Sequence, residues 1–290
     1  MKYHLTLIIA IFLCSCSGAK KVIENQPKQT KTVTEVPKND SPVLKPTPVE
    51  SSKTQNTITE QSENIEDSIT KHNTTIESFN HMIWQELLKQ HVSKNGNVDY
   101  SAFKNDSKQL RQYIDALNTK TPTEKWSKED KLAYWINAYN ALTIDLILRN
   151  YPLNSIKDIK DPWDQRLWKF GNKWLNLNDI EHQILRKMEE PRIHFAIVCA
   201  SESCPKLLNE AFTAGKLEVQ LTNATKTFLS DTTKNEISEN NIKLSKIFKW
   251  FAKDFKNDGS LIDFLNQYSE VTIINKAKKS FKDYDWSLNN

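Results

Sequence analysis

The stretch SKEDKLAYWINAYNALTIDLILRN, residues 127–150, decides the fold. Ser127 followed three residues later by Asp130 is a pattern that begins helices, and Asn150 lies shortly before a proline, where helices end. When the stretch is projected at about 100° per residue, apolar side chains cover most of the circumference. A helix of this kind is buried on nearly all sides. We therefore expect it in the middle of the folded domain.

Two asparagines, Asn137 and Asn140, lie on or beside this apolar surface. A buried amide without hydrogen-bond partners costs about 1 to 3 kcal/mol, so both side chains need partners. In one interpretation they bond to a neighbouring backbone and fix the packing of the helix. In the other interpretation they line a ligand pocket.

The rest of the folded part predicts further helices and short strands. Helical spacing predicts helices over residues 76–92, 107–118, 179–188, 217–229, 246–255 and 260–268. Turn residues and short apolar runs predict extended segments or hairpins at NVDYSAF (97–103), WKFGNKWLNL (168–177), IHFAIVC (193–199), EISENNIKLS (236–245) and FKDYDW (281–286). Because IHFAIVC is continuously apolar and too short for a typical helix, it predicts a strand buried on both faces.

The beginning of the chain, MKYHLTLIIAIFLCSCSGAK, has the organisation of an export signal. Its apolar run is too short to span a bilayer. The small residues around Cys16 resemble a bacterial lipobox, in which the cysteine is diacylated and becomes the mature N-terminus. We therefore predict a signal peptide over residues 1–15, a membrane anchor at Cys16 and a location in the bacterial cell envelope. The periplasmic side of the outer membrane is the expected place, and disulfides persist in that compartment.

The lipidated end continues into a predicted linker over residues 16–75. This segment is rich in Thr, Ser, Pro, Lys, Asn, Gln and Glu and has almost no aromatic residues. It cannot bury enough apolar surface to offset its conformational entropy, so we expect a disordered stalk with a reach of roughly 40 Å. Residues 76–290 contain all eight tryptophans and predict one globular domain. Its expected class is α+β, with a central buried helix and surrounding helices and short strands.

Composition excludes several classes of function. The net charge of +4 is spread along the chain without a basic stripe, so we expect no nucleic-acid partner. Only five glycines occur, which excludes glycine-rich phosphate loops, and neither GxSxG nor HExxH is present. We expect no cofactor.

Several segments of unusual composition follow one another along the folded part: YWINAYNALTI, LNLNDIEHQILR, PRIHFAIVCASESCPKL, LSKIFKWFAKDF and YDWSLN. Together they resemble the family known as domain of unknown function 547 (DUF547), whose activity is unsettled. The resemblance implies helices packed on a mostly antiparallel sheet, similar to papain-like or transglutaminase-like enzymes. Papain-like enzymes carry a nucleophilic cysteine at the start of the central helix. The helix over residues 127–150 has no cysteine, so that catalytic arrangement does not transfer.

The resemblance also points to a set of polar and titratable residues. The positions that look like family positions are Asn137, Asn140, Glu181, His182, Arg186, Arg192, His194, Cys199 and Cys204. Such a set is more polar than a purely structural core requires.

The stretch HFAIVCASESCP, residues 194–205, permits three interpretations. Cys199 and Cys204 are the two cysteines of the folded part, and a disulfide between them would hold the turn after the apolar run. Alternatively, Cys199 is a thiol nucleophile, for which His182 is a better base than His194. A zinc site is the least favoured interpretation, because CxxxxC is not a usual zinc spacing, and we expect no metal.

Two functions therefore fit the sequence. The first is a binding or scaffolding module of the envelope, whose pocket is formed by Asn137, Asn140, Glu181, His182, Arg186, Arg192 and His194. The second is a thiol-dependent hydrolase or transferase that acts on an envelope peptide or polymer. In it Cys199 attacks a carbonyl, His182 moves the proton, and Asn140 or a backbone N–H of the ASES turn stabilises the oxyanion.

Overall fold

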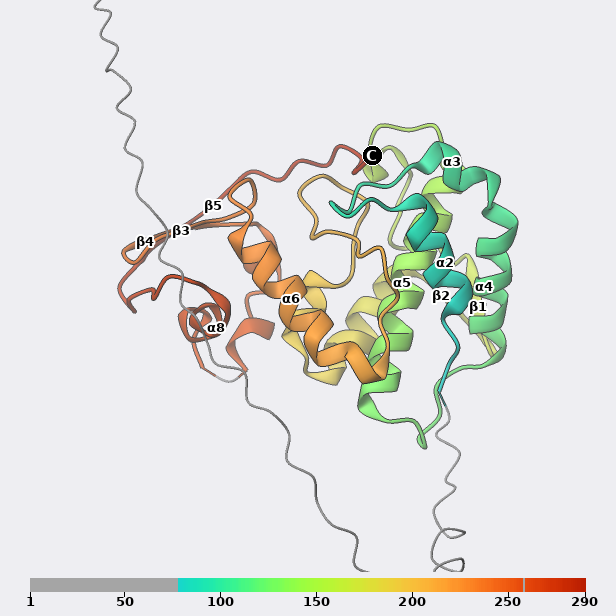
Figure 1. Ribbon diagram of the computed structural model, residues 1–290, viewed down its shortest axis with the longest axis horizontal. Helices are drawn as coiled ribbons and strands as arrows, with labels where there is room; N and C mark the ends of the chain where they lie inside the picture. Colours follow the sequence, from blue (N-terminus) through green and yellow to red (C-terminus); the bar gives the residue numbers. More distant parts are fainter. Residues whose placement is uncertain (1–77, 258) are drawn as a thin grey trace, which may run out of the picture. The chain divides into compact units, whose positions relative to one another are not determined.

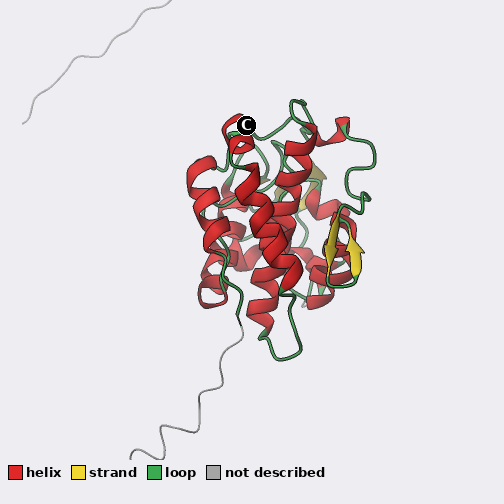
Figure 2. Cartoon of the chain, turned by 90° about the vertical axis from the view of Figure 1, so that its right-hand side faces the viewer, coloured by secondary structure: helices red, strands yellow, loops and turns green. Residues whose placement is uncertain are grey.

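The structure is a computed structural model that describes residues 78–257 and 259–290 (Figure 1). The predicted signal peptide, the lipidation site at Cys16 and the predicted linker fall in residues 1–77 and therefore lie outside the described residues. In the described part, helices predominate and the strands are short (Figure 2). Among the described helices, none is both long and apolar enough to cross a bilayer.

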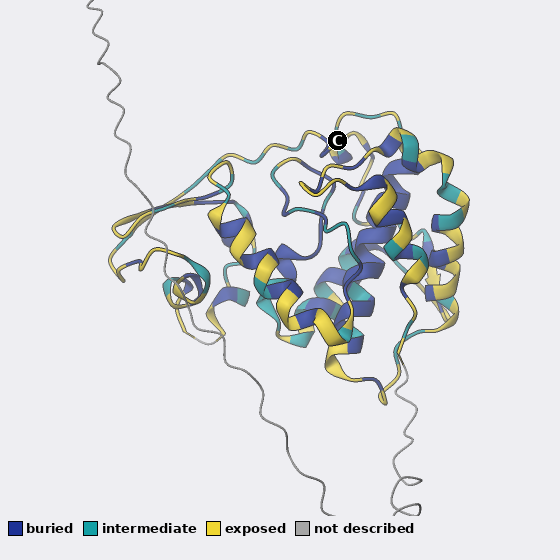
Figure 3. Cartoon of the chain, in the orientation of Figure 1, coloured by how far each residue is buried: buried dark blue, intermediate teal, exposed yellow. Residues whose placement is uncertain are grey.

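Helix α5 (Lys128–Asn150) is the central element of the domain, as predicted. Every residue from Ile136 to Leu148 is buried, and Figure 3 shows the helix dark blue over most of its length. Asp145 is buried as well, and its carboxylate accepts a hydrogen bond of 2.7 Å from the indole N–H of Trp168. The predicted central buried helix is confirmed.

Further helices cover α5. On one side lie α2 (Met82–His91), α3 (Tyr100–Asn105) and α4 (Ser107–Thr119), and on the other lies α6 (Leu217–Ser230) (Figure 1). The C-terminal part adds α7 (Ile247–Trp250) and α8 (Leu261–Tyr268). Short 3₁₀ helices connect these elements: η1 (Ile156–Asp158), η3 (Leu185–Met188), η4 (Pro191–Phe195), η5 (Ala214–Lys216) and η6 (Asp254–Lys256).

The strands form two small sheets. The predicted hairpin at residues 168–177 is confirmed, because β1 (Trp168–Phe170) pairs antiparallel with β2 (Lys173–Leu175). The second sheet contains β3 (Glu236–Ile237), β4 (Asn241–Leu244) and β5 (Lys278–Phe281). Here β3 and β4 are antiparallel, as the predicted hairpin requires, whereas β4 and β5 are parallel. The α+β class is thus confirmed, with its strands divided between the two sheets.

Apolar side chains gather in two clusters. The larger one surrounds α5 and includes side chains of α2, α3 and α4. The smaller one lies between α6, β4, α7 and α8 and is dominated by phenylalanines, namely Phe195, Phe228, Phe248, Phe255 and Phe264. The segment between η4 and Cys204 runs from the smaller cluster to the larger one, because Phe195 belongs to the former and Ala196 and Val198 to the latter.

The prediction of a buried strand over IHFAIVC was wrong. Pro191 opens the 3₁₀ helix η4, whose first turn is capped by the Glu190 side chain, and the residues after Phe195 are irregular. The run is still buried. Continuous apolarity reports burial, and it does not distinguish a strand from other buried backbone. The side-chain amide of Asn140 in α5 supplies hydrogen-bond partners for the backbone of Ala196 and Val198, which a neighbouring strand would otherwise have provided.

Three other boundaries differ from the prediction. NVDYSAF does not form a strand, because the Asp99 side chain accepts a hydrogen bond from the backbone N–H of Ala102 and starts helix α3. The last strand lies earlier than FKDYDW, since its parallel partner β4 ends at Leu244, opposite Phe281. The helix expected over residues 246–255 is divided into α7 and η6.

Candidate functional site

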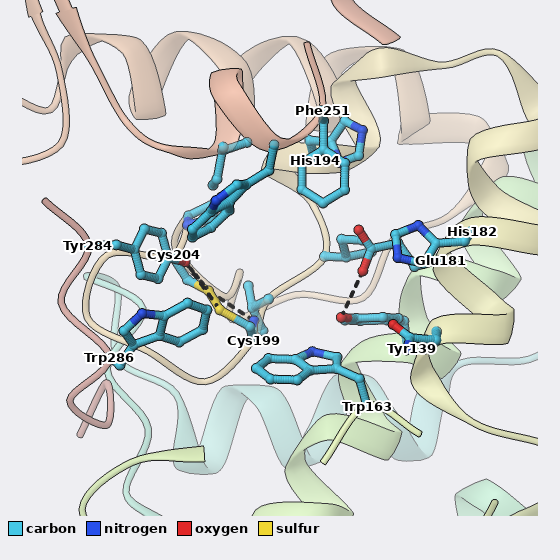
Figure 4. Close-up of a pocket in the computed structure, with 16 residues that line it drawn as sticks. Tyr139, Trp163, Glu181, His182, His194, Cys199, Cys204, Phe251, Tyr284 and Trp286 are labelled. Carbon is cyan, nitrogen blue, oxygen red and sulfur yellow. Dashed lines mark hydrogen bonds between the residues drawn. A yellow bond between two sulfur atoms is a disulfide. The ribbon is translucent and has the colours of Figure 1, made fainter. Parts of the chain in front are cut away.

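A cavity of about 290 Å³ lies beside α5, where the segment that contains the two cysteines meets the C-terminal part of the chain. Its polar lining consists of Tyr139, Asn178, Glu181, His182, His194 and Tyr284. Its aromatic lining consists of Trp163, Trp250, Phe251 and Trp286. In Figure 4, Glu181 and Tyr139 lie on one side, and the two cysteines, Tyr284 and Trp286 lie opposite them.

Glu181 and His182 belong to η2 (Asp179–Ile184), a π-helical turn within the helix that the sequence predicted. Asn178 precedes the turn, and its side chain makes no capping hydrogen bond. Asn176 holds the start of the turn instead: its side-chain oxygen accepts from the backbone N–H of Asp179 at 2.7 Å. The Glu181 carboxyl group is therefore not used as a cap and lines the cavity. Single π turns occur frequently at functional sites.

Glu181 is buried, with 7% of the residue exposed. Burial raises its pKa to about 7, although a hydrogen bond from Tyr139 and the charge of Arg186 oppose the shift. The Tyr139 hydroxyl donates to Glu181 Oε2 at 3.2 Å. Glu181 can therefore take up or release a proton near neutral pH.

A network of charges lies behind the cavity wall. Arg186 donates from Nε and Nη2 to the carboxylate of Asp254 at 2.6 and 2.7 Å, and His194 Nε2 donates to the same carboxylate at 2.8 Å. Burial opposes ionisation of Asp254, but the hydrogen bonds from Arg186 and His194 hold its pKa below the usual range. Asp254 lies in η6, so the network ties the C-terminal part of the chain to residues 179–195.

The two histidines of the cavity are held neutral. Burial is the main cause that lowers the pKa of both His182 and His194, and the charge of Arg186 lowers them further. Arg186 Nη1 lies 3.0 Å from His182 Nδ1. Arginine can only donate, so Nδ1 accepts and the proton of His182 is on Nε2. His194 stacks on Phe251 with ring centroids 3.9 Å apart.

Aromatic rings form a continuous arch on the opposite side. Trp286 contacts Trp163 edge-on at 73°, Tyr284 at 49° and Trp250 at 29°, with centroid distances of 5.8, 4.5 and 5.7 Å. Lys157 Nζ lies 4.7 Å from the centroid of the Trp286 ring. Trp250 is 45% exposed, so the arch reaches the surface.

Cys199 and Cys204 form a disulfide that is part of the cavity wall. The hydroxyls of Ser201 and Tyr284 lie within hydrogen-bond distance of its sulfur atoms. Of the three interpretations of this stretch, the structure has the disulfide. Cys199 and His182 line the same cavity, but a bonded sulfur is not a nucleophilic thiolate.

Asn137 and Asn140 do not line the cavity, and each binds a backbone segment with both ends of its amide. Asn140 donates to the carbonyl of Ala196 at 2.9 Å and accepts from the N–H of Val198 at 3.0 Å. Asn137 does the same with Phe212, at 2.8 and 3.0 Å. These are the partners that the buried amides need. With both ends of its amide engaged, Asn140 is not free to stabilise an oxyanion in this arrangement.

Arg192 lies away from the cavity. Its guanidinium is shared between Glu190 and Glu218, with contacts from 2.7 to 2.8 Å. Among the candidate residues, the structure thus brings Glu181, His182, His194, Cys199 and Cys204 together in one cavity, with Arg186 directly behind it. Among the described residues, no group of three or more His, Cys, Asp or Glu side chains could hold a metal ion.

Sequence reasoning missed most of the aromatic lining and Asp254. Trp163, Trp250, Tyr284 and Trp286 are scattered over more than a hundred positions. The only available signal was the density of aromatic residues in YDWSLN and KIFKWF, where four of the five aromatic side chains contact each other or the cavity histidines. No local pattern could indicate the role of Asp254, because its partners His194 and Arg186 lie 60 and 68 residues away in the sequence.

The comparisons with known proteins agree with the resemblance of the sequence motifs. Residues 123–229 match the family model described as "Protein of unknown function, DUF547". Neither the curated proteins nor the solved structures gave a significant match. The match includes α5, η2 and the disulfide, and it ends before α7 and the last aromatic residues of the cavity. The chain therefore contains a DUF547 domain at residues 123–229.

Proposed function

We propose that this protein is a lipid-anchored protein of the bacterial cell envelope whose DUF547 domain binds a small ligand, or the end of an envelope peptide or polymer, in the cavity beside α5. The binding function is supported chiefly by the lining of the cavity, whose volume is about 290 Å³. The aromatic arch forms one side of it, and the buried carboxyl group of Glu181 lies on the other. Ligand sites typically combine mostly apolar walls with a few placed polar groups.

The state of the cysteines supports binding over thiol chemistry. Cys199 is joined to Cys204, and Asn140 is used by the backbone of residues 196–198. A thiol-dependent reaction would need a free Cys199 and an oxyanion donor beside it. The cavity instead has aromatic surfaces and a few polar side chains that can contact a bound ligand.

The anchor is supported by the sequence around Cys16 and is tested separately. Substitution Cys16→Ala prevents diacylation, so we expect the variant in the soluble fraction while the wild-type chain stays with the membranes. Fractionation after labelling with an alkyne-tagged fatty acid measures both effects. Membrane retention of an unlabelled Cys16→Ala chain would contradict the proposed anchor.

Binding is tested through the tryptophans of the arch. The full chain is titrated with a panel of envelope-type compounds, namely amino sugars, amino acids, short peptides and alkylammonium salts, and its intrinsic fluorescence is recorded. We expect at least one compound to change the emission saturably. Trp286→Leu should abolish that change, and Trp174→Ala, a control at an exposed tryptophan of β2, should retain it.

The binding function is refuted if no compound gives a saturable change, or if Trp286→Leu binds as well as the wild type. Circular dichroism of both variants checks that each is folded.

A further inference from the structure

Three pairs of aromatic rings around the cavity meet at large angles, whereas Trp250 and Trp286 are inclined by only 29°. Trp286 is inclined by 73° to Trp163 and by 49° to Tyr284, and Tyr284 is inclined by 54° to Trp250. Rings arranged in this way enclose a rounded group from several sides. A flat sugar ring, by contrast, stacks best on one open ring face.

The cavity offers few free polar groups. Asn178 donates to Asp164 at 2.6 Å, His194 is bonded to Asp254, and the Tyr284 hydroxyl is engaged by Ser201 and the disulfide. Among the titratable side chains of the lining, the Glu181 carboxyl group and Nε2 of His182 remain, beside the single N–H donors of the tryptophans. A ligand with many hydroxyl groups would leave several of them unsatisfied, which is unfavourable.

The charges of the site favour a cation over an anion. The cationic group behind the wall, Arg186, is neutralised by the bidentate bond to Asp254. No ion pair in the described part of the chain includes Glu181, and the cation that acts on it, Arg186, is already paired with Asp254, so ionised Glu181 adds a negative charge beside the cavity. The faces of aromatic rings also attract cations, as Lys157 over the ring of Trp286 illustrates within this structure.

From these observations we infer that the group bound in the cavity is a compact organic cation, an alkylated ammonium group, with Trp163, Tyr284 and Trp286 around it and Glu181 as its counter-ion. This inference rests on the proposed binding function and specifies its ligand class. Aromatic rings together with a carboxylate form the usual environment for quaternary ammonium groups.

The ionisation of Glu181 makes the affinity depend on pH. Tyr139 of α5, His182 and Arg186 of the η2–η3 segment, and Asp254 of η6 are the groups that act on it. With a pKa near 7, Glu181 is mostly protonated at pH 6 and mostly ionised at pH 8. We expect the affinity for a cation to rise about 10-fold between these values.

The test measures binding of choline chloride and of 3,3-dimethyl-1-butanol, its neutral isostere, to the full chain by calorimetry at pH 8 and constant ionic strength. We expect choline to bind at least about 10-fold more tightly than the isostere, and Glu181→Gln to remove that preference. Trp286→Leu should weaken binding of both compounds, and Trp174→Ala should affect neither. Glycerophosphocholine is included as well, because tighter binding of this compound than of choline would identify a lipid headgroup, and not a free cation, as the source of the ammonium group.

The outcomes separate this inference from the function on which it rests. Equal affinity for choline and its isostere, or unchanged preference in Glu181→Gln, overturns the cation as ligand and leaves a binding cavity. Saturable binding of N-acetylglucosamine in place of choline also overturns the cation as ligand and leaves a binding cavity. If none of these compounds binds and the wider panel also gives no response, the binding function itself is refuted.

Discussion

The two walls of the cavity differ in how they are built. The polar wall, with Tyr139, Glu181, His182 and His194, comes from the DUF547 domain and is buried and cross-bonded. Most of the aromatic arch comes from residues 250–286, beyond the match, and reaches the surface. One wall is held by hydrogen bonds to the core, whereas the other consists of rings that contact each other. We therefore expect substitutions in the first to affect stability and substitutions in the second to affect binding.

The largest effect is expected from the side chain that supports the polar wall. Asn140→Ala leaves the carbonyl of Ala196 and the N–H of Val198 buried without partners, so the free energy of unfolding should fall by about 3 to 4 kcal/mol. Urea unfolding measures the loss. Asn223→Ala, at an exposed position of α6, is the control and should change stability by less than about 0.5 kcal/mol. Equal losses in the two variants would show that Asn140 does not hold the segment.

A second effect concerns the pH dependence of folding. The pKa of Glu181 is about 7 in the folded chain, against 4.5 for the free side chain, so the folded state binds the proton more tightly. This stabilisation is complete below pH 4.5 and is lost as pH rises through 7, for a total of about 3 kcal/mol.

The measurement compares wild type with Glu181→Gln. His182 and His194, whose pKa values are lowered, act in the opposite sense over part of the same range, but they are common to both chains. The difference between the two unfolding free energies isolates Glu181. It should move in favour of Glu181→Gln by about 3 kcal/mol between pH 4.5 and pH 8.5. A difference that is constant with pH contradicts a raised pKa.

A smaller loss of stability is expected when the disulfide in the cavity wall is removed. Replacing both Cys199 and Cys204 by serine opens a short ring, which should lower stability by about 2 kcal/mol. Because a binding cavity needs no thiol, ligand binding should persist in the double variant. Loss of all binding in a folded double variant would instead assign the cysteines a direct part in recognition.

The smallest change in stability is expected in the aromatic wall. Trp250 is 45% exposed, so Trp250→Ala should alter the free energy of unfolding by less than about 1 kcal/mol. Its binding of the cavity ligand should nevertheless weaken about 10-fold, because one ring of the arch is lost. Fluorescence titration and urea unfolding of the same sample separate the two effects. If Trp250→Ala lost stability and kept its affinity, the aromatic arch would serve stability and not binding, contrary to the expectation.

Local patterns in the sequence were sufficient for the elements of the fold. The apolar circumference of residues 127–150 predicted the buried position of α5, and Gly171 with Asn172 predicted the hairpin of β1 and β2. Periodicity and turn residues report which side chains are buried and where the chain reverses. At IHFAIVC these patterns correctly indicated that the segment is buried. They did not indicate which groups its backbone bonds to, so the predicted strand was wrong. Those groups are the two ends of one side-chain amide, that of Asn140, in a helix more than fifty residues earlier.

The sequence by itself determined the central helix, most of the covering helices and the hairpins, and its resemblance to DUF547 pointed to Glu181, His182 and His194 of the polar wall. Only the tertiary structure decided that Cys199 bonds to Cys204, that Asn137 and Asn140 hold the backbone, and that Asp254 closes the charge network. It also brought Trp250 and Trp286 into the lining of the same cavity as Glu181, with Trp286 on the opposite side from it. The physical reason is that local patterns encode the environment of a side chain, whereas the identity of its neighbours depends on how distant segments pack together.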